Sequence, residues 1–223
     1  MVRYSKAYYP LNLPQVIDMA DESSLGFDGQ QKLAWVISRI LDPGIVLSIM
    51  IVILIWQSRV DFKRGLLWSL LLLCLAVILP LLYVLYLMRK GEISDWDISN
   101  RRERYALLFF TIFCWLLSVI ILVVFDGPKL LLASAVDGLA ILSVYSLITI
   151  SWKISIHSGA ISCPVTILII LFGPSFLPLI LLVLAMIWAR YKMRKHNLLQ
   201  LIGGALLTSS ITVLVFSSFG YLK

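Results

Sequence analysis

The residues best suited to chemistry are His157 and His196, the only two histidines in the sequence. Each stands near a cation where a polar stretch gives way to an apolar one: Lys153 precedes His157, and Arg190 precedes His196. Imidazole can act as a nucleophile or as a general acid, and cations can hold phosphate oxygens in place. Together the two segments indicate phosphoryl transfer through a histidine.

Spacing within these segments adds partners to both histidines. Lys153 and His157 are four residues apart, as are His196 and Gln200, so each pair would share a helical face if a helix began there. Gln200 could then hydrogen-bond the imidazole and fix its tautomer. We expect Lys153, Ser155 and Arg190 to bind the phosphate.

A third polar segment, residues 95–104 (DWDISNRRER), combines acids with arginines. Its cations are Arg101, Arg102 and Arg104. Asp95 and Asp97 could hold Mg²⁺ that bridges a diphosphate, because this ion prefers oxygen ligands. The alternative is that both acids pair with arginines of the same segment, as exposed charge runs usually do.

The composition of the chain indicates that these segments belong to a protein embedded in a lipid bilayer. Hydrophobic residues make up 61% of the 223 residues and charged residues only 14%, which leaves too little polar surface for a water-soluble globule. The formal net charge of +7 suits anionic headgroups or a phosphorylated substrate. Outside the apolar segments, aromatic and basic residues do not alternate in a way that would indicate nucleic-acid binding.

Apolar segments long enough for helices recur along most of the chain. Because a spanning helix needs roughly 20 apolar residues, and the first and fifth segments are short, we predict an all-α, polytopic membrane helix bundle of six or seven transmembrane helices. Pro80 should kink the second segment. The segments are residues 41–57, 66–88, 105–125, 130–152, 158–172, 176–189 and 198–216.

The N-terminal part differs from this pattern. Residues 1–40 form a polar segment, in which apolar positions at helical spacing over 30–41 predict an amphipathic helix lying at the membrane interface. A cap over the bundle is the alternative. Residues 41–223 form the transmembrane domain.

Seven spans would bring the three polar segments to one side of the membrane, together with the N-terminus. That side carries 14 of the 19 Lys and Arg residues, and the other side carries 5. By the positive-inside rule, the candidate site faces the cytosol.

One acid lies inside an apolar segment, in the middle of residues 130–152. An intramembrane carboxylate such as Asp137 marks a functional site or an interhelical hydrogen bond. Ser134, Ser143 and Tyr145 on the same segment leave both interpretations open.

The polar segments resemble the signatures of the type 2 phosphatidic acid phosphatase superfamily. Arg190 is followed after five residues by His196, and His196 after three residues by Gln200. This spacing resembles the family's third signature, which is serine-arginine, five residues, histidine, three residues and aspartate. Residues 155–160 (SIHSGA) resemble the second, proline-serine-glycine-histidine. Residues 95–104 stand where the first, lysine, six residues, arginine-proline, would be, with Arg102 seven after Asp95. The differences are Asp95 for lysine, Glu103 for proline, Ile154 and Ile156 for proline and glycine, Ala189 for serine and Gln200 for aspartate.

The resemblance implies a role for each matched residue. His196 would be the nucleophile that forms a phosphohistidine, His157 the general acid, and Arg102 and Arg190 the phosphate ligands. The expected reaction is hydrolysis of a lipid phosphate or an isoprenoid diphosphate in the membrane.

Two other functions fit the same residues. A metal-dependent prenyl transferase or cyclase acting on an isoprenyl diphosphate would need Asp95 and Asp97 and would tolerate loss of His196. A catalytically degenerate lipid-binding membrane subunit would bind the lipid without turnover.

Overall fold

The computed structural model describes residues 28–98 and 100–222, with only the backbone at Arg101. Most of the predicted N-terminal polar segment, including Arg3 and Lys6, therefore lies outside the described residues, as does Lys223. The described chain contains helices and no strand, which confirms the predicted all-α bundle.

The helices follow the apolar segments of the sequence closely. Six stretches of the described chain are long and apolar enough to cross a membrane: α1 with α2, α3 with α4, α5, α6, η3 with α8, and α9. The remaining apolar helix, α7, has 17 residues. The protein is therefore an integral membrane protein. The elements are α1 (Gly29–Ile40), α2 (Pro43–Gln57), α3 (Phe62–Leu73), η1 (Cys74–Ile78), α4 (Leu79–Arg89), η2 (Arg101–Glu103), α5 (Arg104–Val124), α6 (Lys129–Thr149), α7 (Ile156–Phe172), η3 (Pro174–Leu179), α8 (Ile180–Lys192) and α9 (Leu198–Ser218).

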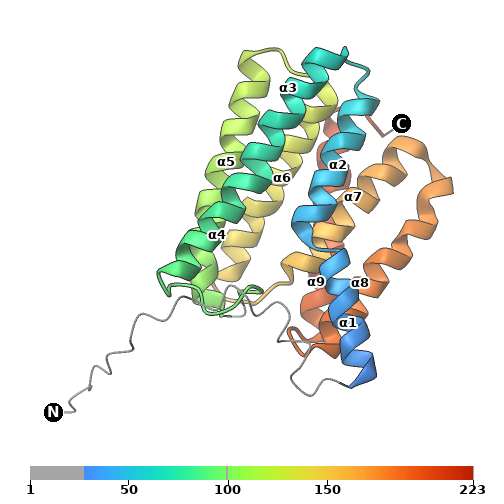
Figure 1. The fold of residues 1–223 in the computed structure, drawn as a ribbon. Helices are drawn as coiled ribbons and strands as arrows, with labels where there is room; N and C mark the ends of the chain where they lie inside the picture. The colour runs from blue at the N-terminus through green and yellow to red at the C-terminus, as the bar shows by residue number, and fades with distance from the viewer. Residues whose placement is uncertain (1–27, 99, 223) are drawn as a thin grey trace.

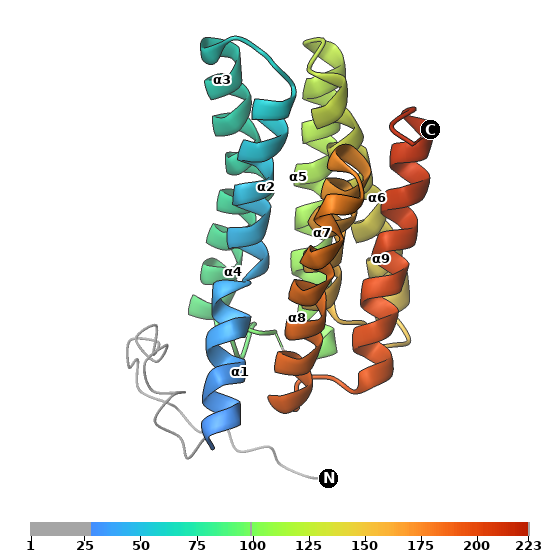
Figure 2. The same ribbon diagram turned by 90° about the vertical axis from the view of Figure 1, so that its right-hand side faces the viewer.

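The first helix continues the direction of the second. Asp42 caps α2 by accepting from the Gly44 N–H, and Pro43 occupies the first turn, where its missing N–H costs least. Below this break α1 packs against α8, with Ala34 and Ser38 buried (Figure 2). The predicted amphipathic helix is thus present, and it lies against the bundle.

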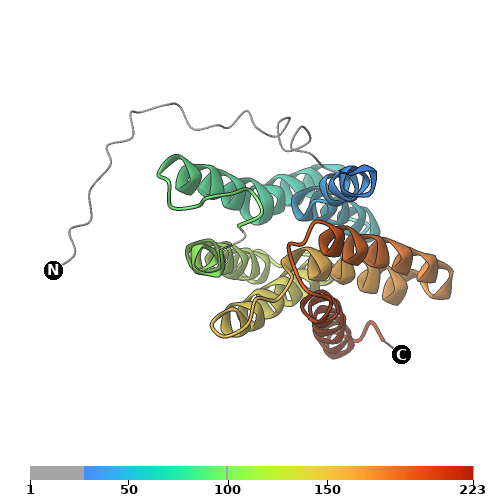
Figure 3. The same cartoon turned by 90° about the horizontal axis from the view of Figure 1, so that it is seen from below.

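The predicted irregularity near Pro80 is a π-helical segment, η1, between α3 and α4. Proline cannot donate a backbone hydrogen bond, and a wider turn lets the chain continue as a helix around that gap. Seen from below, α1 to α4 form one row, and α5 to α9 lie together on one side of that row (Figure 3).

Small and polar side chains hold α6, α7 and α9 together. The Tyr145 hydroxyl of α6 donates to the Gly204 carbonyl of α9 (2.9 Å). Asp137 accepts hydrogen bonds from Thr212 (3.0 Å) and Cys163 (3.3 Å). These bonds favour the interhelical interpretation of Asp137.

The connections between helices divide into two ends. The segments before α5, before α7 and before α9 all lie at one end of the bundle, the lower end in Figure 1. The α2–α3, α5–α6 and α7–α8 connections lie toward the other end. The convergence of the three polar segments, expected from the span count, is therefore present.

Candidate functional site

The carboxylate of Asp97 lies at the centre of the three polar segments. Its Oδ1 is 2.9 Å from Arg190 Nη1 and 3.9 Å from His157 Nε2, and its Oδ2 is 3.2 Å from Lys195 Nζ. Burial by itself would raise the pKa of Asp97, but Arg190, His157 and Lys195 together hold it well below its usual value. The Asp97 carboxylate is thus held by side chains from two other, distant parts of the chain: His157 at the start of α7, and Arg190 with Lys195 around the end of α8.

Arg190 is the most buried cation of this cluster, with 1% of its surface exposed. The end of α8 carries it, and its Nη1 donates to Asp97 and to Ser38 of α1 (3.2 Å). Its Nε has no hydrogen-bond partner among the described residues. A buried guanidinium with an unused N–H can donate a hydrogen bond to a further anionic oxygen.

The first polar segment supplies Arg104, and not Arg102, to this cluster. Arg104 is buried at the start of α5, where its Nε donates to the Ile98 carbonyl (2.8 Å) and its Nη1 to the Ile154 carbonyl (3.1 Å). Arg102 is exposed. The sequence could not distinguish the two arginines, since only the start of α5 determines which one turns inward.

His196 is buried just before α9, and its contacts fix its tautomer. The Gln200 Oε1 accepts the Asn197 N–H (3.2 Å) in the capping box of α9 and also lies 3.2 Å from His196 Nδ1. Because a carbonyl oxygen has no proton to give, Nδ1 must be the donor. The other nitrogen, Nε2, then carries the lone pair that a nucleophile needs.

The surroundings of His196 keep it neutral. Burial, and next the charges of Arg104, Lys153 and Arg190, lower the pKa of His196 to about 3. The predicted contact with Gln200 is therefore present, although it arises from helix capping and not from a shared helical face.

Lys153 and Ser155 serve the local structure at the start of α7. Lys153 precedes the helix, so it does not share a helical face with His157 as predicted; its Nζ donates to the Lys195 carbonyl (3.1 Å). Burial, followed by Arg104, lowers the pKa of Lys153. Ser155 is fully buried and caps α7 by accepting from the Ser158 N–H (3.4 Å). Lys153 adds charge to the site, whereas Ser155 acts as a helix cap.

A cavity of about 190 Å³ adjoins the cluster. The charged or titratable residues that line it are Asp42, Asp97, Arg104 and His157. The rest of its wall is largely apolar, with contributions from α4, α5 and the connection between them: Leu81, Val84, Trp96, Leu107 and Leu108. The cavity thus joins a charged end to an apolar one, as an amphiphilic ligand requires.

The predicted Mg²⁺ site does not fit these contacts. Both oxygens of Asp97 already face cations, and Asp95 interacts electrostatically with Arg104 and Lys153. The described residues contain no group of three or more acids, histidines or cysteines that could hold a metal ion. We therefore derive no step through a metal.

Comparison with protein-family models, curated proteins and solved structures found no match for this chain.

Proposed function

We propose that this protein hydrolyses the phosphate ester of a membrane lipid, or an isoprenoid diphosphate, through a phosphohistidine on His196. The observation that supports this proposal is the convergence of two imidazoles with Arg104, Lys153 and Arg190 at one end of the bundle. His157 and His196 are close enough to interact electrostatically. We further propose, from the charge bias of the loops, that this end faces the cytosol.

The proposed chemistry uses the lone pair on His196 Nε2. Attack on phosphorus forms the N–P bond as the P–O ester bond breaks, and protonated His157 gives its proton to the leaving oxygen. Water then attacks the phosphohistidine and gives a proton to His157, which is neutral after the first step; the N–P bond breaks, and phosphate is released. Arg104 and Arg190 stabilise the charge on the equatorial oxygens.

The carboxylate of Asp97 occupies the position that a phosphate oxygen would take beside Arg190. Arg190 Nη1 and Lys195 Nζ are ordinary phosphate ligands. We propose that the substrate phosphate displaces Asp97 from these cations. Burial, followed by the charge of Arg190, holds the pKa of His157 well below its usual value. The bound phosphate, which offsets the charge of Arg190, and the freed carboxylate beside the ring would together favour the protonated, acidic form of His157.

We propose that the substrate tail begins along the apolar wall of the 190 Å³ cavity. Leu107 and Leu108 belong to α5, and Leu81 and Val84 to α4, so the tail would run between these two helices. A water-soluble phosphate ester would leave this wall unfilled. This favours an amphiphilic substrate.

The buried arginine also bears on the resemblance to the type 2 phosphatidic acid phosphatases. Asp97 and Arg104 are seven residues apart, the same separation as in the family's first signature and as between Asp95 and Arg102. Because Arg104 is buried and Arg102 is exposed, we propose that residues 97–104, and not 95–102, correspond to the first signature. Asp97 then stands at the lysine position and Tyr105 at the proline position.

Phosphate release from a panel of phospholipid and isoprenyl phosphates tests the proposal. We expect His196→Ala and His157→Ala each to lower turnover by about a hundredfold or more, the usual cost of losing a nucleophile or a general acid. Arg104→Gln should also lower turnover strongly. Arg102→Gln, which changes an exposed arginine, is the matched control and should leave turnover unchanged. Full turnover in both histidine variants would exclude the mechanism, and a requirement for added Mg²⁺ would contradict the metal-free assignment.

A second candidate is a subunit that binds lipid phosphates without turnover. Gln200, a neutral residue, stabilises an imidazolium less than a carboxylate does, and Asp97 already neutralises part of the cluster. Two results together would favour this function. Wild type would release no phosphate, and a lipid phosphate would bind saturably to both wild type and His196→Ala.

A further inference from the structure

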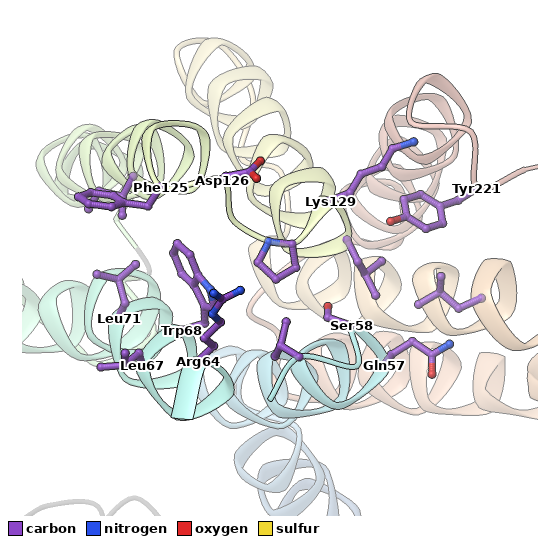
Figure 4. A pocket seen from close by; sticks show the side chains of 15 residues that line it. Gln57, Ser58, Arg64, Leu67, Trp68, Leu71, Phe125, Asp126, Lys129 and Tyr221 are labelled. Carbon is purple, nitrogen blue, oxygen red and sulfur yellow. The ribbon is translucent and has the colours of Figure 1, made fainter. Parts of the chain in front are cut away.

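A larger cavity, of about 940 Å³, lies at the end of the bundle opposite the histidines (Figure 4). It lies between α3 and the α5–α6 connection, and the ends of α2 and α7 also contribute to its wall. Arg104 begins α5 and Phe125 follows its end, so about 30 Å of helix separate this cavity from the candidate site. The proposed hydrolysis does not involve it.

The wall of this cavity is apolar over much of its area and cationic at its edge. Leu67, Trp68 and Leu71 line it from α3, and Arg64, one turn earlier, reaches into the space beside Trp68 in Figure 4. Across the cavity, Lys129 begins α6 with its Nζ 5.9 Å from the centre of the Tyr221 ring. Two cations on different helices thus stand over an apolar wall.

The neighbouring surface places this edge at the level of lipid headgroups. Three aromatic side chains beside the cavity are largely exposed: Trp56 (76%), Phe62 (84%) and Phe125 (70%). Aromatic residues at the ends of spanning helices are typical of the membrane–water interface. A ligand that enters from this level meets the cations first and the apolar wall next.

We propose that this cavity binds an anionic membrane phospholipid. Arg64 and Lys129 would hold the phosphate of the headgroup, and one acyl chain would lie along Leu67 and Leu71. The volume is in the range of about 300–1,000 Å³ found for ligand pockets. Asp61 lies 3.5 Å from Arg64 Nε, and Asp126 also lines the cavity, so these acids oppose headgroups with more than one negative charge. The ligand is therefore best matched by a phospholipid with a single net charge, such as phosphatidylglycerol.

Lipid retention by the full chain tests this proposal. The protein would be placed in nanodiscs of phosphatidylcholine with a minor fraction of phosphatidylglycerol, and the lipids that stay bound would be counted by native mass spectrometry. We expect phosphatidylglycerol to be enriched over its bilayer fraction by about fivefold or more, since one cation near a membrane attracts an anionic lipid by about that factor.

Charge-removing variants identify where the enriched lipid binds. Arg64→Gln with Lys129→Gln should reduce the enrichment at least about fivefold, because both cations are lost. Lys63→Gln is the matched control: it removes the same charge at the same end, but Lys63 does not line the cavity. Leu71→Trp, which fills the wall and keeps both cations, should also reduce the enrichment while circular dichroism shows unchanged helicity.

Three results would overturn the proposal. The first is retention of phosphatidylglycerol at its bilayer fraction. The second is equal enrichment in wild type and in the double variant, and the third is an equal effect of Lys63→Gln. Inorganic phosphate that competes for the site without any lipid would show that the acyl chain is not recognised.

Discussion

At the scale of single residues, the candidate site is a balance of buried charges around Asp97. Arg190 and Lys195 neutralise its carboxylate, and burial with the charges of Arg104, Lys153 and Arg190 keeps His196 unprotonated. Each group therefore depends on the others, and removal of one should alter the behaviour of the rest.

Asp97→Asn is expected to destabilise the protein, because it leaves Arg190 buried without its counter-ion. Removal of one partner of a buried pair costs about 3 kcal/mol of the free energy of unfolding. Phosphate or a lipid phosphate should restore more stability in this variant than in wild type, because the ligand replaces the lost carboxylate. Thermal unfolding with and without ligand measures both effects.

Glu92→Gln is the control for that measurement. Glu92 lies in the same connection, and its ion pair with Lys90 is exposed, so its loss should change the thermal midpoint little. An unchanged midpoint in Asp97→Asn, or no extra stabilisation by phosphate, would show that Asp97 does not occupy an anion site.

His196 should remain neutral in mildly acidic solution. Because its folded pKa of about 3 lies below the unfolded value near 6.5, the unfolded state takes up the proton first. The free energy of unfolding contributed by His196 is therefore largest above about pH 6.5 and falls as the pH drops toward 3. In ¹⁵N-histidine-labelled protein, the His196 signals should not titrate between pH 7 and pH 5.

Arg104→Gln provides the comparison for this titration. Loss of the nearby positive charge should raise the pKa of His196 toward its ordinary value, whereas Arg102→Gln should leave it in place. With only two histidines in the sequence, His157→Gln assigns the remaining signal. A His196 that titrates near pH 6.5 in wild type would contradict the buried, cation-lined geometry.

At the scale of the helices, the close approach of α7 and α9 determines where the two histidines lie. The small residues at 203–205 (GGA) allow such an approach. It occurs at Gly204, where a Cβ atom would lie 2.6 Å from the Ser155 carbonyl and 2.7 Å from the Ser158 hydroxyl. The start of α7, which carries His157, is thereby fixed against the start of α9, which follows His196.

Gly204→Ala should push these two helix starts apart. The added methyl would contact backbone, which cannot rotate away, so we expect a loss of about 1–3 kcal/mol in the free energy of unfolding. Turnover or lipid-phosphate affinity should fall further than stability alone explains, since the histidines would separate. Gly29→Ala, where an added Cβ meets open space, should change neither property.

At the scale of the whole molecule, the number of spans brings the three polar segments to one end. The short helix α7 and the following α8 form a hairpin, so the chain returns to the same end before α9 (Figure 1). The apolar faces of the bundle then meet lipid, and the charged groups gather where the helices end.

Orientation in the membrane can be tested by thiol labelling of a variant without the native cysteines. A cysteine at Glu92, near the candidate site, should react with a membrane-impermeant reagent only after the cells are opened. A cysteine at Lys63, at the opposite end, should react in intact cells, because the positive-inside rule places that end outside. The reverse pattern would put the candidate site outside the cell.

The sequence by itself determined the class of fold and indicated which polar segments meet at one end of the bundle. Lipid cannot hydrogen-bond the backbone, so long apolar segments must be helices, and their number places the polar segments on one side. Capping signals such as Asn197 with Gln200 are local, which is why α9 and the His196 partner could be predicted from neighbouring residues.

Only the tertiary structure decided which polar side chains meet. Arg102 and Arg104 are alike in the sequence, but only Arg104 is buried, with hydrogen bonds to the Ile98 and Ile154 carbonyls. The sequence predicts Asp97 as a metal ligand, whereas in the fold its oxygens lie beside Arg190 and Lys195, 93 and 98 positions away. Such contacts depend on how remote helices pack, and spacing along the chain does not encode them.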